Sequence, residues 1–206
     1  MPFFAQHVRS AQTHLKKNDE TMRNLIREVG PFTLKAQRHH FNMLVRSIIS
    51  QQISTAAART ILGRVHEFAG DPVSPEALAG VSIDEFRQLG VSQQKASYLI
   101  DLTAKVNSGV VDLKKVSRKA DSEVIDELIQ VKGIGVWTAQ MFMMFSLARM
   151  DVLPAGDLGI RNAIKQAYGF AELPSPAEIE EVAQPWRPYA TIASWYLWRS
   201  LELQPK

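Results

Sequence analysis

A short segment with two glycines, followed further along the chain by a single acid, is the part of this sequence that could do chemistry. Residues 131–139 read VKGIGVWTA, and Asp157 lies 20 residues after Trp137 in the stretch LPAGDLGIR. Glycine lets the backbone turn sharply and bring its N–H groups close to an anion, and a helix that begins there presents its positive end. The pattern predicts a turn that grips phosphate, followed by an acid.

Helical patterns flank the glycine turn on both sides. Asp121 or Ser122 is expected to cap a helix that ends at the glycines, and a second helix is expected from Val136. We expect the second helix to be central and buried, because it is apolar nearly all round: Trp137, Ala139, Met141, Phe142, Met143, Phe145 and Leu147. A tight corner between two packed helices is the competing interpretation of the glycines.

Composition excludes several classes of protein. The chain has 206 residues, of which 46% are hydrophobic and 22% charged, as in an ordinary soluble protein of one domain or two small lobes. It lacks cysteine, which excludes disulfides, thiolate metal sites and iron–sulfur clusters and fits a reducing cytosol. The net charge of +3 is compatible with a polyanionic partner but does not require one.

No segment has the length or pattern of a membrane span or a signal peptide. The longest apolar run, Met141 to Phe145, is too short to cross a bilayer, and the start of the chain is an amphipathic pattern of Phe4, Val8, Ala11 and Leu15. We therefore expect no membrane partner and a cytoplasmic location, with association to the nucleoid if the protein is bacterial.

The elements that must position the acid and the glycines are predicted to be helices throughout. Core faces repeat at helical spacing in three stretches: Met22, Leu25, Ile26 and Val29, ended by Gly30-Pro31; Phe41, Leu44, Val45, Ile48 and Ile49; Ile61, Leu62, Val65 and Phe68. Start signals occur at Ser82, Ser92 and Ser175-Pro176, and no stretch alternates as a strand would. The predicted fold class is all-α.

Several of these motifs together resemble the helix-hairpin-helix DNA glycosylase superfamily. The hairpin match comprises Gly133, Gly135, Thr138 and Ala139, with Pro154 and Asp157 downstream. Residues 41–54 resemble the segment that wedges into the minor groove in the 3-methyladenine DNA glycosylase II, or AlkA-like, group, and 186–196 resemble its C-terminal active-site helix. The resemblance covers about residues 37–199 and indicates a compact form without the group's N-terminal β domain.

The resemblance implies a fold of two helical lobes flanking a DNA-binding cleft. Residues 1–36 are expected to form N-terminal helices that pack with the C-terminal lobe, and 37–133 a central helical bundle. Residues 134–206 are expected to contain the second helix of the hairpin, the loop of the catalytic Asp and the C-terminal helices.

The resemblance also implies roles for single residues. Asp157 would stabilise the cationic sugar that forms when an N-glycosidic bond breaks, and the same side chain could cap a helix from Leu158 to Tyr168. Relatives that also cut the strand carry a lysine nucleophile where this chain has Trp137, and tryptophan cannot form an imine. The expected enzyme therefore leaves an intact abasic site.

Aromatic and apolar residues are expected to line the base pocket. They are Trp137, Trp195, Tyr196 and Met141, of which Met141 replaces a tyrosine of well-known bacterial relatives. An aromatic face attracts a cationic base by roughly 0.5 to 2 kcal/mol, although a tryptophan in a helical protein commonly packs in the core instead.

DNA contacts are expected from two places. Gln52, beside Gln51, occupies the wedge position, although both could simply form a polar helix end before a Ser54 cap. Lys132, Gly133, Gly135 and Thr138 are expected to contact phosphate. The resemblance implies no required cofactor and no iron–sulfur cluster, but a structural Na⁺ or K⁺ could bind backbone carbonyls of the hairpin: Ile129, Val131 and Ile134.

The implied activity is base excision repair of alkylated bases, such as 3-methyladenine and 7-methylguanine, by base flipping in double-stranded DNA. We expect a monomer. A non-enzymatic helix-hairpin-helix DNA-binding module is the alternative, but it leaves Asp157, Trp137 and Trp195 without a shared purpose. A member acting on mismatched or oxidised bases would usually carry the lysine or a four-cysteine cluster, and this chain has neither.

Overall fold

Helices make up all the regular secondary structure of residues 7–203, the part of the chain that the computed structural model describes. The α-helices are α1 (Val8–Asn18), α2 (Glu20–Val29), α3 (His40–Ser50), α4 (Thr55–Ala69), α5 (Ile83–Gln88), α6 (Gln93–Asn107), α7 (Asp121–Leu128), α8 (Val136–Phe145), α9 (Leu158–Tyr168), α10 (Pro176–Ala183) and α11 (Ala190–Glu202), with 3₁₀ turns η1 (Val116–Arg118) and η2 (Gln184–Trp186). The predicted fold class is confirmed. Within this range, no helix has the length and apolar character needed to span a membrane.

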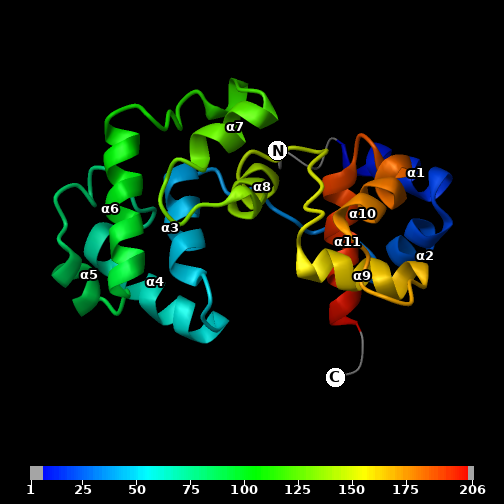
Figure 1. Cartoon of the computed structure of the whole chain (residues 1–206), viewed down its shortest axis with the longest axis horizontal. Coiled ribbons are helices and arrows are strands. Elements are labelled where there is room, and N and C mark those ends of the chain that lie inside the picture. The colour runs from blue at the N-terminus through cyan, green and yellow to red at the C-terminus, as the bar shows by residue number, and fades with distance from the viewer. Residues whose placement is uncertain (1–6, 204–206) are drawn as a thin grey trace. The chain divides into compact units, whose positions relative to one another are not determined.

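The chain divides into two units, whose α-helices are labelled in Figure 1. The central unit is residues 37–142, and the terminal unit is made of the described residues up to Ala36 and from Met143 on. The sequence predicted a boundary at 133/134, whereas the structure divides inside α8. The difference concerns residues 134–142, which pack with the central unit; for example, the ring centroids of His40 and Phe142 lie 5.6 Å apart.

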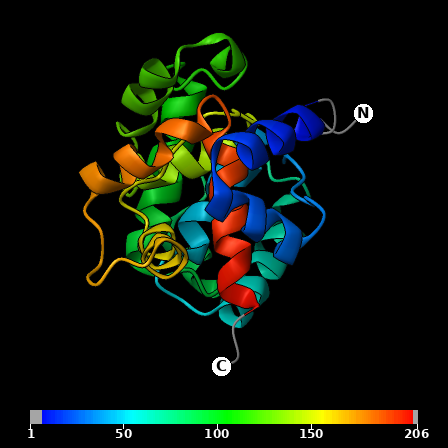
Figure 2. The ribbon, with the colours of Figure 1, turned by 90° about the vertical axis from the view of Figure 1, so that its right-hand side faces the viewer.

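The terminal unit is built around α11. Every residue from Ala190 to Leu197 is buried, and α2 and α9 pack against this helix, as does α1. Figure 2 shows α1 and α2, in blue, beside α11, in red. The predicted stripe of α2 is confirmed at Met22, Leu25 and Ile26. In the predicted N-terminal stripe, Phe4 lies outside the described residues.

A single carboxylate links three parts of the terminal unit. Asp19 lies between α1 and α2, and its Oδ1 accepts the Met22 N–H at 2.8 Å and so caps α2. Its Oδ2 accepts the Tyr168 hydroxyl at 2.6 Å and the Trp186 indole N–H at 2.8 Å. Burial, together with this bond to Asp19, raises the pKa of Tyr168, so the hydroxyl stays a donor.

The central unit packs around α3. Its predicted stripe of Phe41, Leu44, Val45, Ile48 and Ile49 is buried, and α4 and α6 pack against it. The predicted stripe of α4 is wrong at Phe68, which is 47% exposed. Helix α4 buries only Ala58 and Val65, seven residues apart, so its contact face is narrower than the sequence pattern indicated.

Local capping signals correspond well to the helix starts. Ser82 and Ser175 form complete capping boxes with Glu85 and Glu178, and Ser92 caps α6. The predicted cap of α7 by Asp121 or Ser122 is wrong, because the helix begins one residue earlier. Its N-cap is Ala120, whose backbone N–H donates to the Glu123 carboxylate at 2.7 Å.

Replacing Asp19 should destabilise the terminal unit. In the Asp19→Ala variant, α2 loses its cap and the donors of Tyr168 and Trp186 lose their acceptor, so the free energy of unfolding should fall by about 2 to 4 kcal/mol. Urea unfolding followed by tryptophan fluorescence measures the change. The matched control is Glu20→Ala, an exposed neighbour that should cost less than about 1 kcal/mol. Equal losses in the two variants would contradict the role given to Asp19.

Candidate nucleic-acid interface and acid site

The hairpin between α7 and α8 is a pair of tight backbone turns. The Val131 N–H donates to the Leu128 carbonyl at 3.1 Å, and the Ile134 N–H donates to the Val131 carbonyl at 3.0 Å. Helix α7 thus ends at Leu128, before the glycines where the sequence placed its end. The side chains of Val131 and Ile134 are buried, whereas Lys132 and both glycines are exposed.

The two glycines of the hairpin have different surroundings. Gly133 has a φ of +78°, and a Cβ on it would lie 2.7 Å from Cγ of Tyr98. Gly135 has no neighbour within 4 Å of the corresponding position. Close packing between helices therefore explains Gly133 but not Gly135, where the exposed backbone leaves room for a ligand to approach.

The first two residues of α8 are exposed, contrary to the prediction that this helix is buried all round. Val136 and Trp137 are each 50% exposed, whereas Thr138 is buried. Met141, one turn after Trp137, is also buried. Packing in the core, the alternative interpretation of Trp137, does not account for a half-exposed indole at the start of a helix.

The loop of Gln51, Gln52 and Ile53, called the wedge loop below, lies next to the hairpin. Gln51 Nε2 donates to the Gly133 carbonyl at 2.8 Å, which joins residues 82 apart in sequence. Gln52 has a φ of +55°, a left-handed conformation that costs a non-glycine residue roughly 1 to 2 kcal/mol. A left-handed residue is common just after a helix, but that residue is usually glycine, so a glutamine held there is strained and is a candidate for a functional role.

Charged side chains of α6 form hydrogen bonds with the backbone of the hairpin. The Asp101 carboxylate accepts the Lys132 backbone N–H and the Lys105 ammonium, each at 2.8 Å, and Lys105 also donates to the Gln130 carbonyl. Burial of Asp101 works against ionisation, but these bonds and the lysine charges outweigh it and hold its pKa below the usual range.

The carbonyls predicted to bind a monovalent cation belong to the same turns. The Val131 carbonyl accepts the Ile134 N–H and, like any carbonyl oxygen, has a second lone pair. Among the described residues, no group of three or more His, Cys, Asp or Glu side chains could hold a metal. Ligation of Na⁺ or K⁺ by Ile129, Val131 and Ile134 stays a prediction.

The candidate acid lies in the terminal unit and caps a helix. Asp157 is the N-cap of α9, and its Oδ1 accepts the Ile160 N–H at 2.8 Å. The same oxygen accepts the indole N–H of Trp198 at 2.8 Å. The sequence had not singled out Trp198, although its position in α11, three residues after Trp195, was a usable signal.

Gly159 is what lets the indole reach the acid. A Cβ on this glycine would lie 2.9 Å from Asp157 Oδ1 and 3.0 Å from Nε1 of Trp198. Any larger residue would push the indole away from the carboxylate. The close approach of these three residues therefore fixes the orientation of Asp157.

The segment that leads to Asp157 is bonded along one face of α11. The Thr191 N–H donates to the Met150 carbonyl, and its hydroxyl oxygen accepts the Val152 N–H, each at 3.0 Å. Because Thr191, Trp195 and Trp198 recur at helical spacing, Trp195 lies on the face that holds the acid segment.

The two predicted pocket residues on α11, Trp195 and Tyr196, have different surroundings. Trp195 is 7% exposed, and its ring centroid lies 4.6 Å from that of Phe32. Tyr196 is fully buried, and its hydroxyl accepts from Gln12 Nε2 at 2.6 Å and donates to the Gly30 carbonyl at 3.2 Å. Burial raises the pKa of Tyr196. These contacts favour a core role for Tyr196, and its role in a base pocket stays a prediction.

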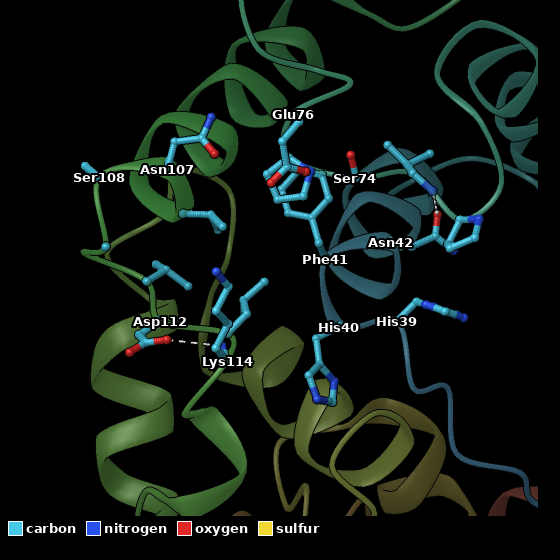
Figure 3. Close-up of a pocket in the computed structure, with 17 residues that line it drawn as sticks. His39, His40, Phe41, Asn42, Ser74, Glu76, Asn107, Ser108, Asp112 and Lys114 are labelled. Carbon is cyan, nitrogen blue, oxygen red and sulfur yellow. Dashed lines mark hydrogen bonds between the residues drawn. The ribbon is translucent and has the colours of Figure 1, made fainter.

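A separate hollow of about 680 Å³ lies in the central unit, and Figure 3 shows its lining side chains. None of the predicted site residues lines it. The Asn42 side chain accepts the Val73 N–H there at 3.2 Å, a bond drawn as a dashed line. Burial lowers the pKa of the neighbouring His40, and electrostatic repulsion from His39 adds to this effect. These contacts anchor the start of α3, whose other end leads to the wedge loop.

The chain is similar to known DNA repair proteins. Residues 45–188 match the model of the HhH-GPD superfamily base excision DNA repair proteins. The chain is 29% identical over 202 residues to the alkylbase DNA glycosidase-like protein mag2 of Schizosaccharomyces pombe, with 95% of each chain covered. It is 35% identical to the putative DNA-3-methyladenine glycosylase YfjP of Bacillus subtilis, covering 79% of this chain and 59% of that protein.

The chain is also similar to a solved structure of a DNA glycosylase. The S. pombe 3-methyladenine DNA glycosylase Mag1, in complex with abasic DNA, is similar with a TM-score of 0.85 and 30% identity. The similarity covers 96% of this chain and all of that one.

The two hairpin glycines should respond differently to substitution by alanine. Gly133→Ala should lower the melting temperature and DNA affinity together, because the added Cβ clashes with Tyr98 at a positive φ. Gly135→Ala should leave the melting temperature nearly unchanged but weaken DNA binding, by about tenfold if the hairpin backbone contacts phosphate. Thermal melts and fluorescence anisotropy with an undamaged duplex measure the two effects. Gly63→Ala, in α4 with open space around it, is the control that should change neither DNA affinity nor fold.

Proposed function

Because this chain belongs to the HhH-GPD superfamily of base excision DNA repair proteins, we propose that it is a DNA-3-methyladenine glycosylase acting on alkylated purines in double-stranded DNA. The observation that carries the proposal is Asp157 in the motif downstream of the hairpin, within the segment that matches the family, with its Oδ1 accepting the Ile160 N–H and the Trp198 indole N–H. Such bonds hold a carboxylate in one orientation. A glycosidic bond breaks through a cationic sugar, which a fixed negative charge stabilises.

The local electrostatics suit this role for Asp157. The carboxylate lies at the N-terminus of α9, where the helix dipole and the backbone N–H favour a negative charge. A fixed carboxylate needs little reorganisation when positive charge grows on the sugar, so it stabilises the transition state more than the ground state. In this proposal Asp157 stabilises the sugar cation and orients the attacking water.

The proposed substrates are bases that leave the sugar readily. Alkylation at a ring nitrogen, as in 3-methyladenine or 7-methylguanine, gives the base a positive charge and makes it a good leaving group. The enzyme then needs no strong general acid to protonate the leaving base. A site with Asp157 as its candidate carboxylate is consistent with this. The half-exposed Trp137 and the Trp195 ring are aromatic faces of the kind that attract a cationic base.

We propose that the enzyme cleaves only the glycosidic bond. Strand cleavage through a Schiff base needs an amine nucleophile, and Trp137, which stands where strand-cleaving relatives carry the lysine, has none. Lys132 lies in the hairpin, with its backbone N–H held by Asp101. Its exposed side chain is better suited to a phosphate contact than to attack on the sugar.

DNA binding in this proposal uses the exposed loops of the central unit. The exposed residues Lys132, Gly133 and Gly135 of the hairpin would contact phosphates, whereas Thr138 is buried and is less suited to the contact predicted for it. A hairpin-bound Na⁺ or K⁺ would be compatible with the hairpin carbonyls. Gln52 would fill the space left by an extruded base, an exchange that involves a few kcal/mol of unstacking. Affinity from phosphate contacts should fall steeply with salt.

Asp157→Asn tests the catalytic role directly. Base release from methylated duplex DNA, identified by mass spectrometry, should fall by at least about 100-fold because the sugar cation loses its counter-charge. Asparagine is also a good N-cap and can still accept from Ile160 and Trp198, so the fold and the affinity for DNA should be retained.

The same reactions decide between the proposal and its alternatives. A wild-type protein that binds DNA but releases no base would be a non-enzymatic DNA-binding module. A covalent adduct trapped by borohydride would contradict the absence of strand-cleaving chemistry.

Trp198→Phe should reduce the turnover rate without abolishing binding. Phenylalanine removes the indole N–H that orients Asp157, and a misplaced carboxylate should lower kcat by about 10- to 100-fold with KM little changed. Trp186→Phe is the matched control, because it removes an indole N–H from the structural Asp19 instead. That control should lose stability but keep its kcat, and equal rate losses in both variants would argue against the role of Trp198.

A further inference from the structure

Helix α6 contacts both exposed loops of the central unit with one row of side chains. Lys95, Tyr98, Asp101 and Lys105 recur every three or four residues and so lie on the same side of the helix. Each of the four contacts the wedge loop, the hairpin or the backbone next to them. The row is called the α6 row below.

Lys95 holds the end of α3 and the first residue of the wedge loop. Its ammonium donates to the Ile49 carbonyl at 2.8 Å and to the Gln51 carbonyl at 2.6 Å. Lys95 lies in the first turn of α6, where the dipole of that helix disfavours a positive charge, and burial lowers its pKa. The last carbonyls of α3 provide the compensating interaction, because a cation is favoured at a helix C-terminus.

The rest of the α6 row holds the hairpin. The Tyr98 ring lies against Gly133, Asp101 accepts the Lys132 N–H, and Lys105 donates to the Gln130 carbonyl. Gln51 connects the wedge loop to the hairpin. Lys95 donates to the Gln51 carbonyl, and the Gln51 side chain donates to the Gly133 carbonyl. The left-handed backbone of Gln52 directly follows this doubly held residue.

We propose that the α6 row sets the spacing between the wedge loop and the hairpin, and that Lys95 is the positioning residue for Gln52. Lys95 acts through the backbone of Gln51 and does not itself contact the extruded base. This inference rests on the proposed function, because positioning of Gln52 matters only if the protein extrudes a base. Loss of Lys95 should impair extrusion more than it impairs binding to the DNA backbone.

Lys95→Met keeps the length of the side chain and removes its donors. Single-turnover base release from methylated duplex should slow by about tenfold, with affinity for undamaged duplex within about twofold of wild type. A duplex with 2-aminopurine opposite a tetrahydrofuran abasic analogue reports insertion of the wedge, and its fluorescence change should shrink in the variant. Lys114→Met removes the same charge from an exposed loop of the same unit and should alter neither readout.

A double-mutant cycle with Gln52→Ala separates positioning from general damage. If Lys95 acts through Gln52, Lys95→Met should have almost no further effect on the rate in the Gln52→Ala background. Multiplicative effects, or a parallel fall in rate and in affinity for undamaged DNA, would overturn the proposal. Lys95→Arg, which keeps a cation near both carbonyls, should restore most of the rate and covers the case in which Lys95→Met does not fold.

The fluorescence readout keeps this proposal distinct from the proposed function. Wild-type protein that releases no base would refute the glycosylase assignment. A wild-type fluorescence change that Lys95→Met leaves intact would refute the role of Lys95 alone, whether or not base is released.

Discussion

Hydrogen bonds between helix side chains and the backbone of short loops hold the candidate functional groups of this protein. Irregular backbone leaves N–H and C=O groups without helical partners, and these groups must be bonded for a loop to keep one conformation. Lys95 and Asp101 on α6 meet this need for the wedge loop and the hairpin. Thr191 on α11 meets it for the segment before Asp157. The conformation of these loops therefore depends on α6 and α11, whose side chains bond to the loop backbone.

The terminal unit uses a similar arrangement of a carboxylate twice, for different ends. Asp19 and Asp157 each cap a helix and each accept an indole N–H, from Trp186 and Trp198 respectively. Asp19 also accepts the hydroxyl of Tyr168, a buried donor whose loss of a partner would be costly. A helix cap together with an indole bond thus does not distinguish a structural carboxylate from a catalytic one. The distinction for Asp157 comes from the motif around it and from the family to which the chain belongs.

Features that depend on neighbours in the sequence could be predicted from it. The capping boxes at Ser82 and Ser175 need only a glutamate three residues later, and the buried stripe of α3 needs only a periodic pattern. Features that depend on the size of a contact face were predicted less well. Phe68 continues the pattern of α4 but is exposed, and Trp137 begins an apolar helix but is half exposed. A pattern shows which residues are apolar, whereas burial depends on which elements arrive to cover them.

By itself the sequence determined the helical class, most helix starts and the motif residues Gly133, Gly135 and Asp157, because these depend on local backbone preferences and on residue type. Only the tertiary structure decided that Tyr98 makes Gly133 obligatory, that Trp198 holds Asp157 and that Lys95 holds the wedge loop. The partners in these last two contacts are separated by more than 40 residues. Such pairs meet only when helices pack, so no local preference encodes them.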